Sequence, residues 1–149
     1  MAEAAKTPST EEHMVGEQRK TNIARVLVAL VFIVNVQCAL QFILWPGSYT
    51  GAYQVEGASA EVMVQTVGLC FLMWNATYPP VIARPDRYRV LFGVVLAQQA
   101  IGLVGESLLL ASLQPGLEVL GGSIARFIAF DAAGLALLAI AFLITRAKA

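Results

Sequence analysis

Four ionisable residues interrupt segments of the sequence that are otherwise apolar. They are Glu61, Glu106, Arg126 and Asp131. Charged residues are costly inside a membrane span, and they usually face a bundle interior, a partner or a water-filled cavity. Carboxylates in such a place accept a proton, bind a cation or pair with a basic side chain, and an arginine holds an anionic or polar group. Their chemistry therefore depends on which of them the fold brings together.

Amide side chains recur at helical spacing in the same segments. One stripe has the spacing i, i+4, i+7, i+11, i+14, which keeps its members on one helix face; it consists of Glu61, Gln65, Gly68, Leu72 and Asn75. Two further stripes consist of Gln99, Gly102 and Glu106, and of Asn35, Cys38 and Gln41, with Gln37 one turn from Gln41. We expect these faces to converge on a polar interior that opens toward the outer side of a membrane.

The elements that carry these residues are predicted to be transmembrane helices. The 149-residue chain is 58% hydrophobic and 13% charged, whereas soluble domains carry about 25% charged residues. Apolar segments cover roughly residues 23–45, 58–78, 88–113 and 122–145, and each is as long as the roughly 20-residue helix that crosses a bilayer. Backbone hydrogen bonds must close within each segment in lipid, so these are helices. The predicted fold is an all-α membrane bundle of four transmembrane helices, arranged up and down.

Basic residues predict the orientation and the domain organisation. Residues 1–20 are polar and are expected to form a disordered cytoplasmic tail, followed by a transmembrane domain over residues 21–149. Nine of the ten basic residues lie near the termini or in the second connection, and the tenth is Arg126. Because basic residues favour the cytoplasmic side, both termini are expected to be cytoplasmic. The small, economical chain favours the cytoplasmic membrane of a bacterium, crossed several times.

Several kinds of chemistry are not supported by the sequence. The only histidine, His13, lies in the tail, and Cys38 and Cys70 form no CxxC pair, so no metal site, haem ligation or disulfide mechanism is predicted. Both cysteines are interpreted as small apolar residues. No phosphate loop, dinucleotide fingerprint or nucleophile elbow is present, so no cofactor and no catalytic residue is predicted. Zero net charge makes nucleic acid an unlikely class of partner.

The charged residues of the last apolar segment are expected to contact different neighbours. Arg126 and Asp131 are five residues apart, which separates their directions by about 140°. With both termini inside, all four intramembrane charges fall in the outer half of the bilayer. We expect Arg126 to pair with Glu106 or Glu61 on a neighbouring helix. Asp131 is expected either to hold a proton or to accept a hydrogen bond from an amide, with Gln99, Gln37 and Gln41 as the candidate donors.

Part of the sequence resembles a known family. Residues 25–78 contain "ALQFILWPGSYTGAYQ" and "VMVQTVGLCFLMWNATY": a span that ends at Pro46, a short aromatic loop, and a span with Gln65 before Gly68. This spacing resembles the DoxX-like set of small bacterial four-helix membrane proteins. The resemblance implies a four-helix bundle, and some members of that set are linked to oxidoreductase complexes. It assigns no catalytic residue to this chain.

Two functional hypotheses follow. In the first, the chain is a small integral membrane protein whose outward-facing polar pocket binds or moves a small molecule, an ion or a proton. The predicted ligand-binding residues are Glu106, Arg126, Asp131, Gln99, Gln65, Gln41 and Glu61. In the second, it is an accessory or assembly subunit whose charges lock helices together or meet a larger membrane complex. Expected partners are the lipid bilayer, a small-molecule or ion ligand, and a homo-oligomer or larger complex. Acid–base catalysis needs only placed carboxyl groups, but no pattern specifies a reaction.

Overall fold

All regular secondary structure that the computed structural model describes, over residues 10–145, is helical. The elements are α1 (Thr10–Leu44), α2 (Gly47–Thr50), η1 (Gly51–Tyr53), α3 (Ala58–Asn75), α4 (Tyr78–Ala83), α5 (Arg89–Ala111) and α6 (Glu118–Ile144). The all-helical prediction is confirmed. The predicted helix limits are close for α3 and α5, whereas α6 begins at residue 118 rather than near residue 122.

Three of these helices are long and apolar enough to cross a membrane by themselves. They are α1 over Met14–Leu44, α5 and α6. A fourth span is obtained only if Gly47–Tyr53 and Ala58–Ala83, which meet at a bend of 95°, are counted as one. The polar residues Glu61, Gln65 and Asn75 on α3 lower the hydropathy of that segment. Length and composition thus indicate a multi-pass membrane protein.

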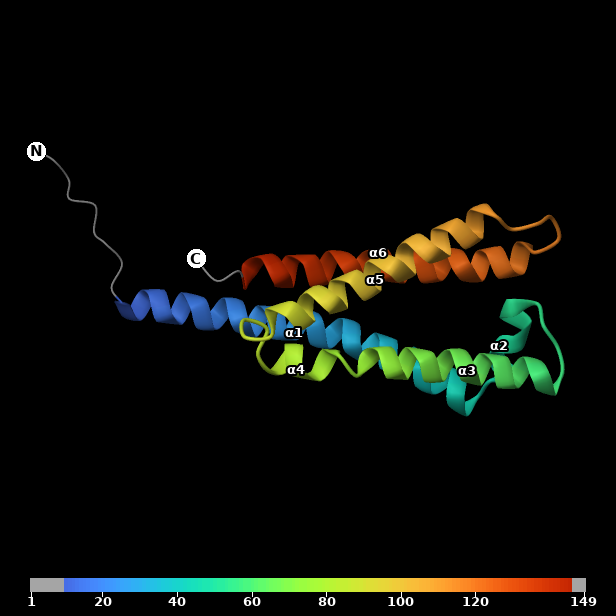
Figure 1. Cartoon of the computed structure of the whole chain (residues 1–149), viewed down its shortest axis with the longest axis horizontal. Coiled ribbons are helices and arrows are strands. Elements are labelled where there is room, and N and C mark those ends of the chain that lie inside the picture. Colours follow the sequence, from blue (N-terminus) through green and yellow to red (C-terminus); the bar gives the residue numbers. More distant parts are fainter. Residues whose placement is uncertain (1–9, 146–149) are drawn as a thin grey trace, which may run out of the picture.

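The long helices form two packed pairs that are joined along one seam (Figure 1). The first pair is α1 with α3, the second is α5 with α6, and α1 packs on α6 between them. Helix α4 packs on both α1 and α5. The start of α1, the end of α6 and connection 84–88 lie at one end, called here the proximal end, and connections 45–57 and 112–117 lie at the other, the distal end (Figure 1).

The first helix begins earlier in the chain than expected. Residues 10–20 are helical, where a disordered tail was expected, and residues 1–9 lie outside the described residues. A helix that is already formed by the apolar segment adds further residues without a new nucleation cost. Side chains one turn apart support the extension: Glu17 and Lys20 form a salt bridge of 3.1 Å, and Gln18 donates to Asn22.

The densest apolar packing lies in the proximal half. Side chains from α1, α4, α5 and α6 are buried together there: Ala24, Val28, Val31, Tyr78, Val81, Phe92, Val95, Leu138 and Ala141. Two arginines join helix ends beside this core. Arg25 donates to the carbonyl of Ala83 at 2.8 Å, and Arg89 donates to the carbonyl of Phe142 at 2.8 Å. Each places a cation at the C-terminal end of another helix, where free carbonyls need donors.

The second connection is partly helical. The predicted second helix ends near Tyr78, but the chain continues from that residue into the short helix α4. Prolines 79 and 80 occupy its first positions, where the missing N–H would have had no helical partner. As a result Tyr78 points into the core, with 1% of its surface exposed, and it reaches the site described next.

Candidate functional site

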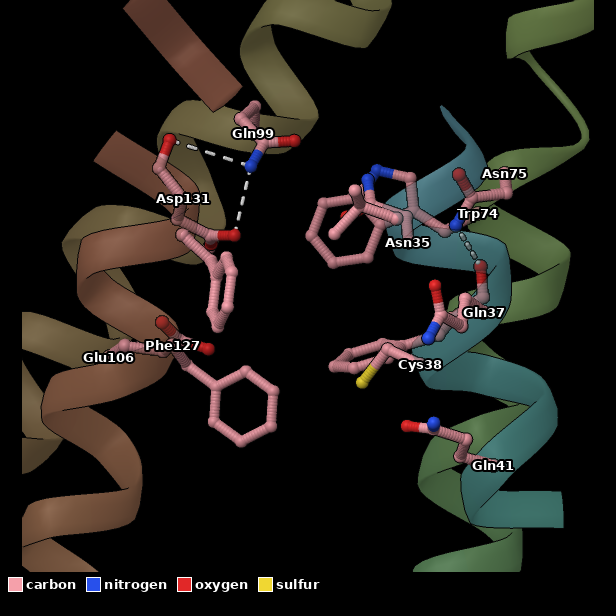
Figure 2. A pocket seen from close by; sticks show the side chains of 14 residues that line it. Asn35, Gln37, Cys38, Gln41, Trp74, Asn75, Gln99, Glu106, Phe127 and Asp131 are labelled. Carbon is pink, nitrogen blue, oxygen red and sulfur yellow. Dashed lines mark hydrogen bonds between the residues drawn. The ribbon is translucent and has the colours of Figure 1, made fainter. Parts of the chain in front are cut away.

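A cavity of about 420 Å³ lies between the two helix pairs, on the distal side of the apolar core. One wall comes from α5 and α6 and carries Gln99, Glu106 and Asp131, as Figure 2 shows. The opposite wall comes from α1 and α3 and carries amide side chains and Cys38 (Figure 2). The predicted convergence of the α1 and α5 stripes on a polar interior is therefore found in the structure.

A chain of hydrogen bonds crosses the bundle at the cavity and links four helices. Asn35 Nδ2 on α1 donates to the Tyr78 hydroxyl on α4 at 3.5 Å. That hydroxyl donates to Gln99 Oε1 on α5 at 3.2 Å, and Gln99 Nε2 donates to Asp131 Oδ1 on α6 at 2.8 Å. The donors all run in one direction and end on a carboxylate. Gln99 is thus the one of the three expected amides that donates a hydrogen bond to Asp131 within the described chain.

Two glycines make room for this network. A Cβ added to Gly102 on α5 would overlap Asp131 Oδ2, and a Cβ added to Gly134 on α6 would lie 3.0 Å from Gln99 Nε2. Close approach of backbone and side chain needs a residue without a side chain. The positions of Gln99 and Asp131 are thus fixed by the shape of the helices around them as well as by their hydrogen bond.

Two buried polar atoms that line the cavity have no hydrogen-bond partner within residues 10–145. They are Glu106 Oε2 and Asn75 Oδ1. Asn75 is 4% exposed, and its Nδ2 donates to the carbonyl of Phe71 at 2.7 Å. A buried acceptor without a donor costs about 1–3 kcal/mol, and more if it is charged. Both atoms therefore lower the stability of the empty protein.

The rest of the lining is largely aromatic. Phe71, Trp74, Phe127 and Phe130 line the cavity from α3 and α6, and the rings of Phe71 and Phe127 lie 6.3 Å apart in an edge-to-face arrangement. Phe130 is 61% exposed and Val34 is 40% exposed. Because both also line the cavity, they mark its rim, where an apolar surface meets the outside of the bundle.

A single glutamine joins the two helix pairs at the distal end. Gln54 Nε2 donates to the carbonyl of Gly116 at 3.0 Å, and Gln54 Oε1 accepts from the backbone N–H of Leu120 at 3.0 Å. Its backbone is left-handed, with φ of 54°, which is unfavourable for a residue other than glycine. Connection 45–57 is also attached to α1, because the Tyr49 hydroxyl donates to Gln41 Oε1 at 3.0 Å.

The structure brings some of the predicted site residues together and places others elsewhere. Glu106, Asp131, Gln99 and Gln41 line the cavity. Gln65 instead donates to the carbonyl of Ile43 at 3.2 Å and joins α3 to α1. The side chain of Glu61 is exposed at the start of α3 and is not part of the cavity lining.

Arg126 does not make the predicted ion pair. It is exposed on α6 and donates to Ser123 Oγ at 3.1 Å, one turn away on the same helix. The one salt bridge within the described part of the chain joins Glu17 to Lys20. Glu106 lines the cavity, whereas Arg126 is not among its lining residues. The prediction that Arg126 and Asp131 point in different directions is confirmed.

Sequence reasoning missed some residues of the site. Tyr78 and Trp74 were not among the predicted site residues, but Tyr78 is buried in the network and Trp74 lines the cavity. A signal was present, because continuing the α3 stripe three residues beyond Asn75 reaches Tyr78. Cys38, interpreted as a small apolar residue, also lines the cavity, and both cysteines are free.

Comparison of the chain with protein-family models, curated proteins and solved structures found no match. The DoxX-like resemblance accordingly stays a prediction.

Proposed function

We propose that this protein crosses the cytoplasmic membrane of a bacterium four times, with both termini inside, and binds or moves a small molecule through its distal cavity. The proximal end carries Arg25, Arg84, Arg87 and Arg89, whereas connections 45–57 and 112–117 contain no basic residue. This asymmetry supports a cytoplasmic proximal end. The cavity then belongs to the outer half of the membrane.

One observation carries the proposal: Glu106 and Asp131 face a cavity inside a single chain rather than its outer surface. A volume of about 420 Å³ lies within the range of small-molecule sites, which combine apolar walls with a few placed polar groups. If the polar residues served only to hold helices together, we would expect their buried hydrogen-bonding atoms to be paired with one another or with the backbone. Glu106 Oε2 and Asn75 Oδ1 are not.

The apolar core supports access from the distal side. Val28, Tyr78, Phe92 and Leu138 fill the bundle on the proximal side of the cavity, and each is at most 1% exposed. A ligand from the cytoplasm would have to displace this packing. From the distal side it meets the connection held by Gln54. The exposed residues Val34 and Phe130 form a rim on the side of the bundle, level with Asn35 and Asp131.

Thiol labelling tests this proposal, because Cys38 lines the cavity while Cys70 is exposed on α3 outside it. A membrane-impermeant maleimide is added to either face of sealed vesicles that contain Cys70→Ser protein, whose only cysteine is Cys38. Labelling from the outer face is expected. The matched control is Cys38→Ser protein, whose Cys70 should not react if it faces lipid. Failure to label Cys38, or labelling from the cytoplasmic face alone, would refute an outward-opening site.

A second candidate function rests on Arg126. Its exposed guanidinium on an apolar helix has Ser123 as its hydrogen-bond partner, and a charge at a lipid-facing position is costly unless it reaches a headgroup or a partner protein. An accessory subunit would use it to contact a larger complex. Wild-type and Arg126→Leu proteins are purified in mild detergent: loss of a stoichiometric companion from the variant supports this function, and an unaccompanied wild-type protein argues against it.

A further inference from the structure

We infer that the ligand of this cavity is an amphiphilic primary ammonium compound: a protonated amine on an apolar or aromatic body. This inference rests on the proposed function, since it names the class of molecule that the same cavity binds. It follows from the charge of the cavity, from the kind of hydrogen-bonding atoms left free, and from the aromatic walls.

The charge of the cavity favours a cation. Glu106 and Asp131 line it, whereas no Lys, Arg or His is among its lining residues in the described chain. Arg126, which was expected to balance the acids, is exposed and bonded to Ser123. An anionic ligand would meet two carboxyl groups without a cation of the protein to receive it, and like charges at short range repel.

The two buried lining atoms without a partner require a donor. Three cavity amides have already committed an N–H group: Asn35 to Tyr78, Gln99 to Asp131 and Asn75 to Phe71. The buried lining atoms left without a partner, Glu106 Oε2 and Asn75 Oδ1, are both acceptors. A primary ammonium group carries three N–H donors and a positive charge. It can pair with the Glu106 carboxylate and donate a hydrogen bond to it, whereas a quaternary ammonium would supply the charge without the donors.

The walls favour an organic cation over a metal ion. Within the described residues there is no group of three or more His, Cys, Asp or Glu side chains that could hold a metal. Trp74, Phe71 and Phe127 instead offer aromatic faces, which attract organic cations and bury apolar groups. The exposed rim residues Val34 and Phe130 extend this apolar surface to the outside of the bundle, so the body of the ligand can remain in contact with it.

Trp74 supplies the readout, because it lines the cavity while the other tryptophan, Trp45, does not. Trp45→Phe protein in lipid nanodiscs is titrated with four matched probes, and Trp74 fluorescence is recorded. The probes are 2-phenylethylammonium, its N,N,N-trimethyl analogue, 2-phenylethanol and 3-phenylpropionate. We expect 2-phenylethylammonium to bind at least about tenfold more tightly than each of the others, as charge-assisted hydrogen bonds imply.

Two variants connect the selectivity to the cavity. Glu106→Gln should lower the affinity for 2-phenylethylammonium by about tenfold or more, because it removes one charge-assisted hydrogen-bond partner. Its affinity for 2-phenylethanol should not change. Glu61→Gln makes the same chemical change at an exposed position outside the cavity and should leave every probe unchanged. Thermal unfolding of both variants in detergent checks that each is folded.

The outcomes separate this inference from the proposed function. Equal affinity for the trimethyl probe, the alcohol or the carboxylate overturns the ammonium class. The ammonium class is also overturned if 2-phenylethylammonium shows no saturable binding up to about 10 mM, a concentration above the dissociation constants of weak ligands. If Cys38 is labelled from outside in the same preparation, the proposed function survives that result. If Cys38 is inaccessible as well, both fail.

Discussion

The glycine at position 102 offers the sharpest test of the site geometry. A Cβ in Gly102→Ala would overlap Asp131 Oδ2, and Asp131 cannot rotate away freely because Gln99 holds its other oxygen at 2.8 Å. Relieving the overlap means losing that charge-assisted hydrogen bond, which costs about 1.5–3 kcal/mol. Alanine in a helix regains about 0.5–1 kcal/mol relative to glycine. The expected net loss in unfolding free energy is about 1–2 kcal/mol.

A matched control lies one turn away on the same helix. Gly105 has no atom within 4 Å of an added Cβ, so Gly105→Ala should gain helix stability and lose no contact. The expected sign is therefore opposite for two glycines in the sequence "GLVGE". A close helix contact through both glycines would instead make both substitutions harmful.

Unfolding in mixed detergent, followed by circular dichroism, measures both substitutions. The double variant Gly102→Ala with Asp131→Ala separates the cause, because it removes the atom that the new methyl group meets. If the overlap with Asp131 is responsible, adding Gly102→Ala to Asp131→Ala should cost nothing. A Gly102→Ala protein as stable as Gly105→Ala, or an undiminished cost in the double variant, would refute the geometry of the network.

Three further predictions concern the cavity, the distal loop and the seam between α1 and α3. Glu106→Met should raise the free energy of unfolding by about 1–3 kcal/mol, because Glu106 Oε2 is buried without a partner within residues 10–145. Chemical denaturation measures this free energy, and a variant less stable than wild type would contradict the prediction. Gln54→Ala removes both hydrogen bonds to the second helix pair and should speed maleimide labelling of Cys38 from outside severalfold, whereas an unchanged rate would show that the loop does not limit access. Gly68→Ala would place a Cβ 2.8 Å from the carbonyl oxygen of Ala39 and should lower the free energy of unfolding by about 1–3 kcal/mol. Thermal unfolding measures the difference, and a variant as stable as wild type would contradict this close approach.

The sequence predicted the parts of the site that follow from helical periodicity. Asn35, Cys38 and Gln41 share a face because they are three residues apart, and all three line the cavity. The same argument placed Gln99 and Glu106 together on α5. The α3 stripe shows the limit of this argument, because Asn75 is its one member that lines the cavity.

The sequence could not predict which polar groups meet across helices. Arg126 was matched to Glu106 because both lie at a similar depth, but depth does not fix rotation about the helix axis. Ser123, one turn away, offered a nearer acceptor. Tyr78 was missed for a different reason: the second apolar segment was predicted to end at residue 78, whereas a new helix, α4, begins there with Pro79 in its first turn. That change of direction turns the tyrosine inward to Gln99.

The distribution of satisfied and unsatisfied groups bears on whether the polar residues are structural or functional. Away from the cavity, Gln65 donates to Ile43 and Arg89 to Phe142, although Arg25 Nε is also buried without a partner within the described chain. At the cavity, Gln99 and Asp131 are likewise satisfied, but Glu106 and Asn75 each retain a buried acceptor without a donor within the described chain. If Glu106→Met is more stable, as predicted above, helix packing does not account for the carboxylate. A buried carboxylate that lowers stability is explained if a ligand donates a hydrogen bond to it. The same low local dielectric that makes an unpaired polar atom costly also strengthens a hydrogen bond made there.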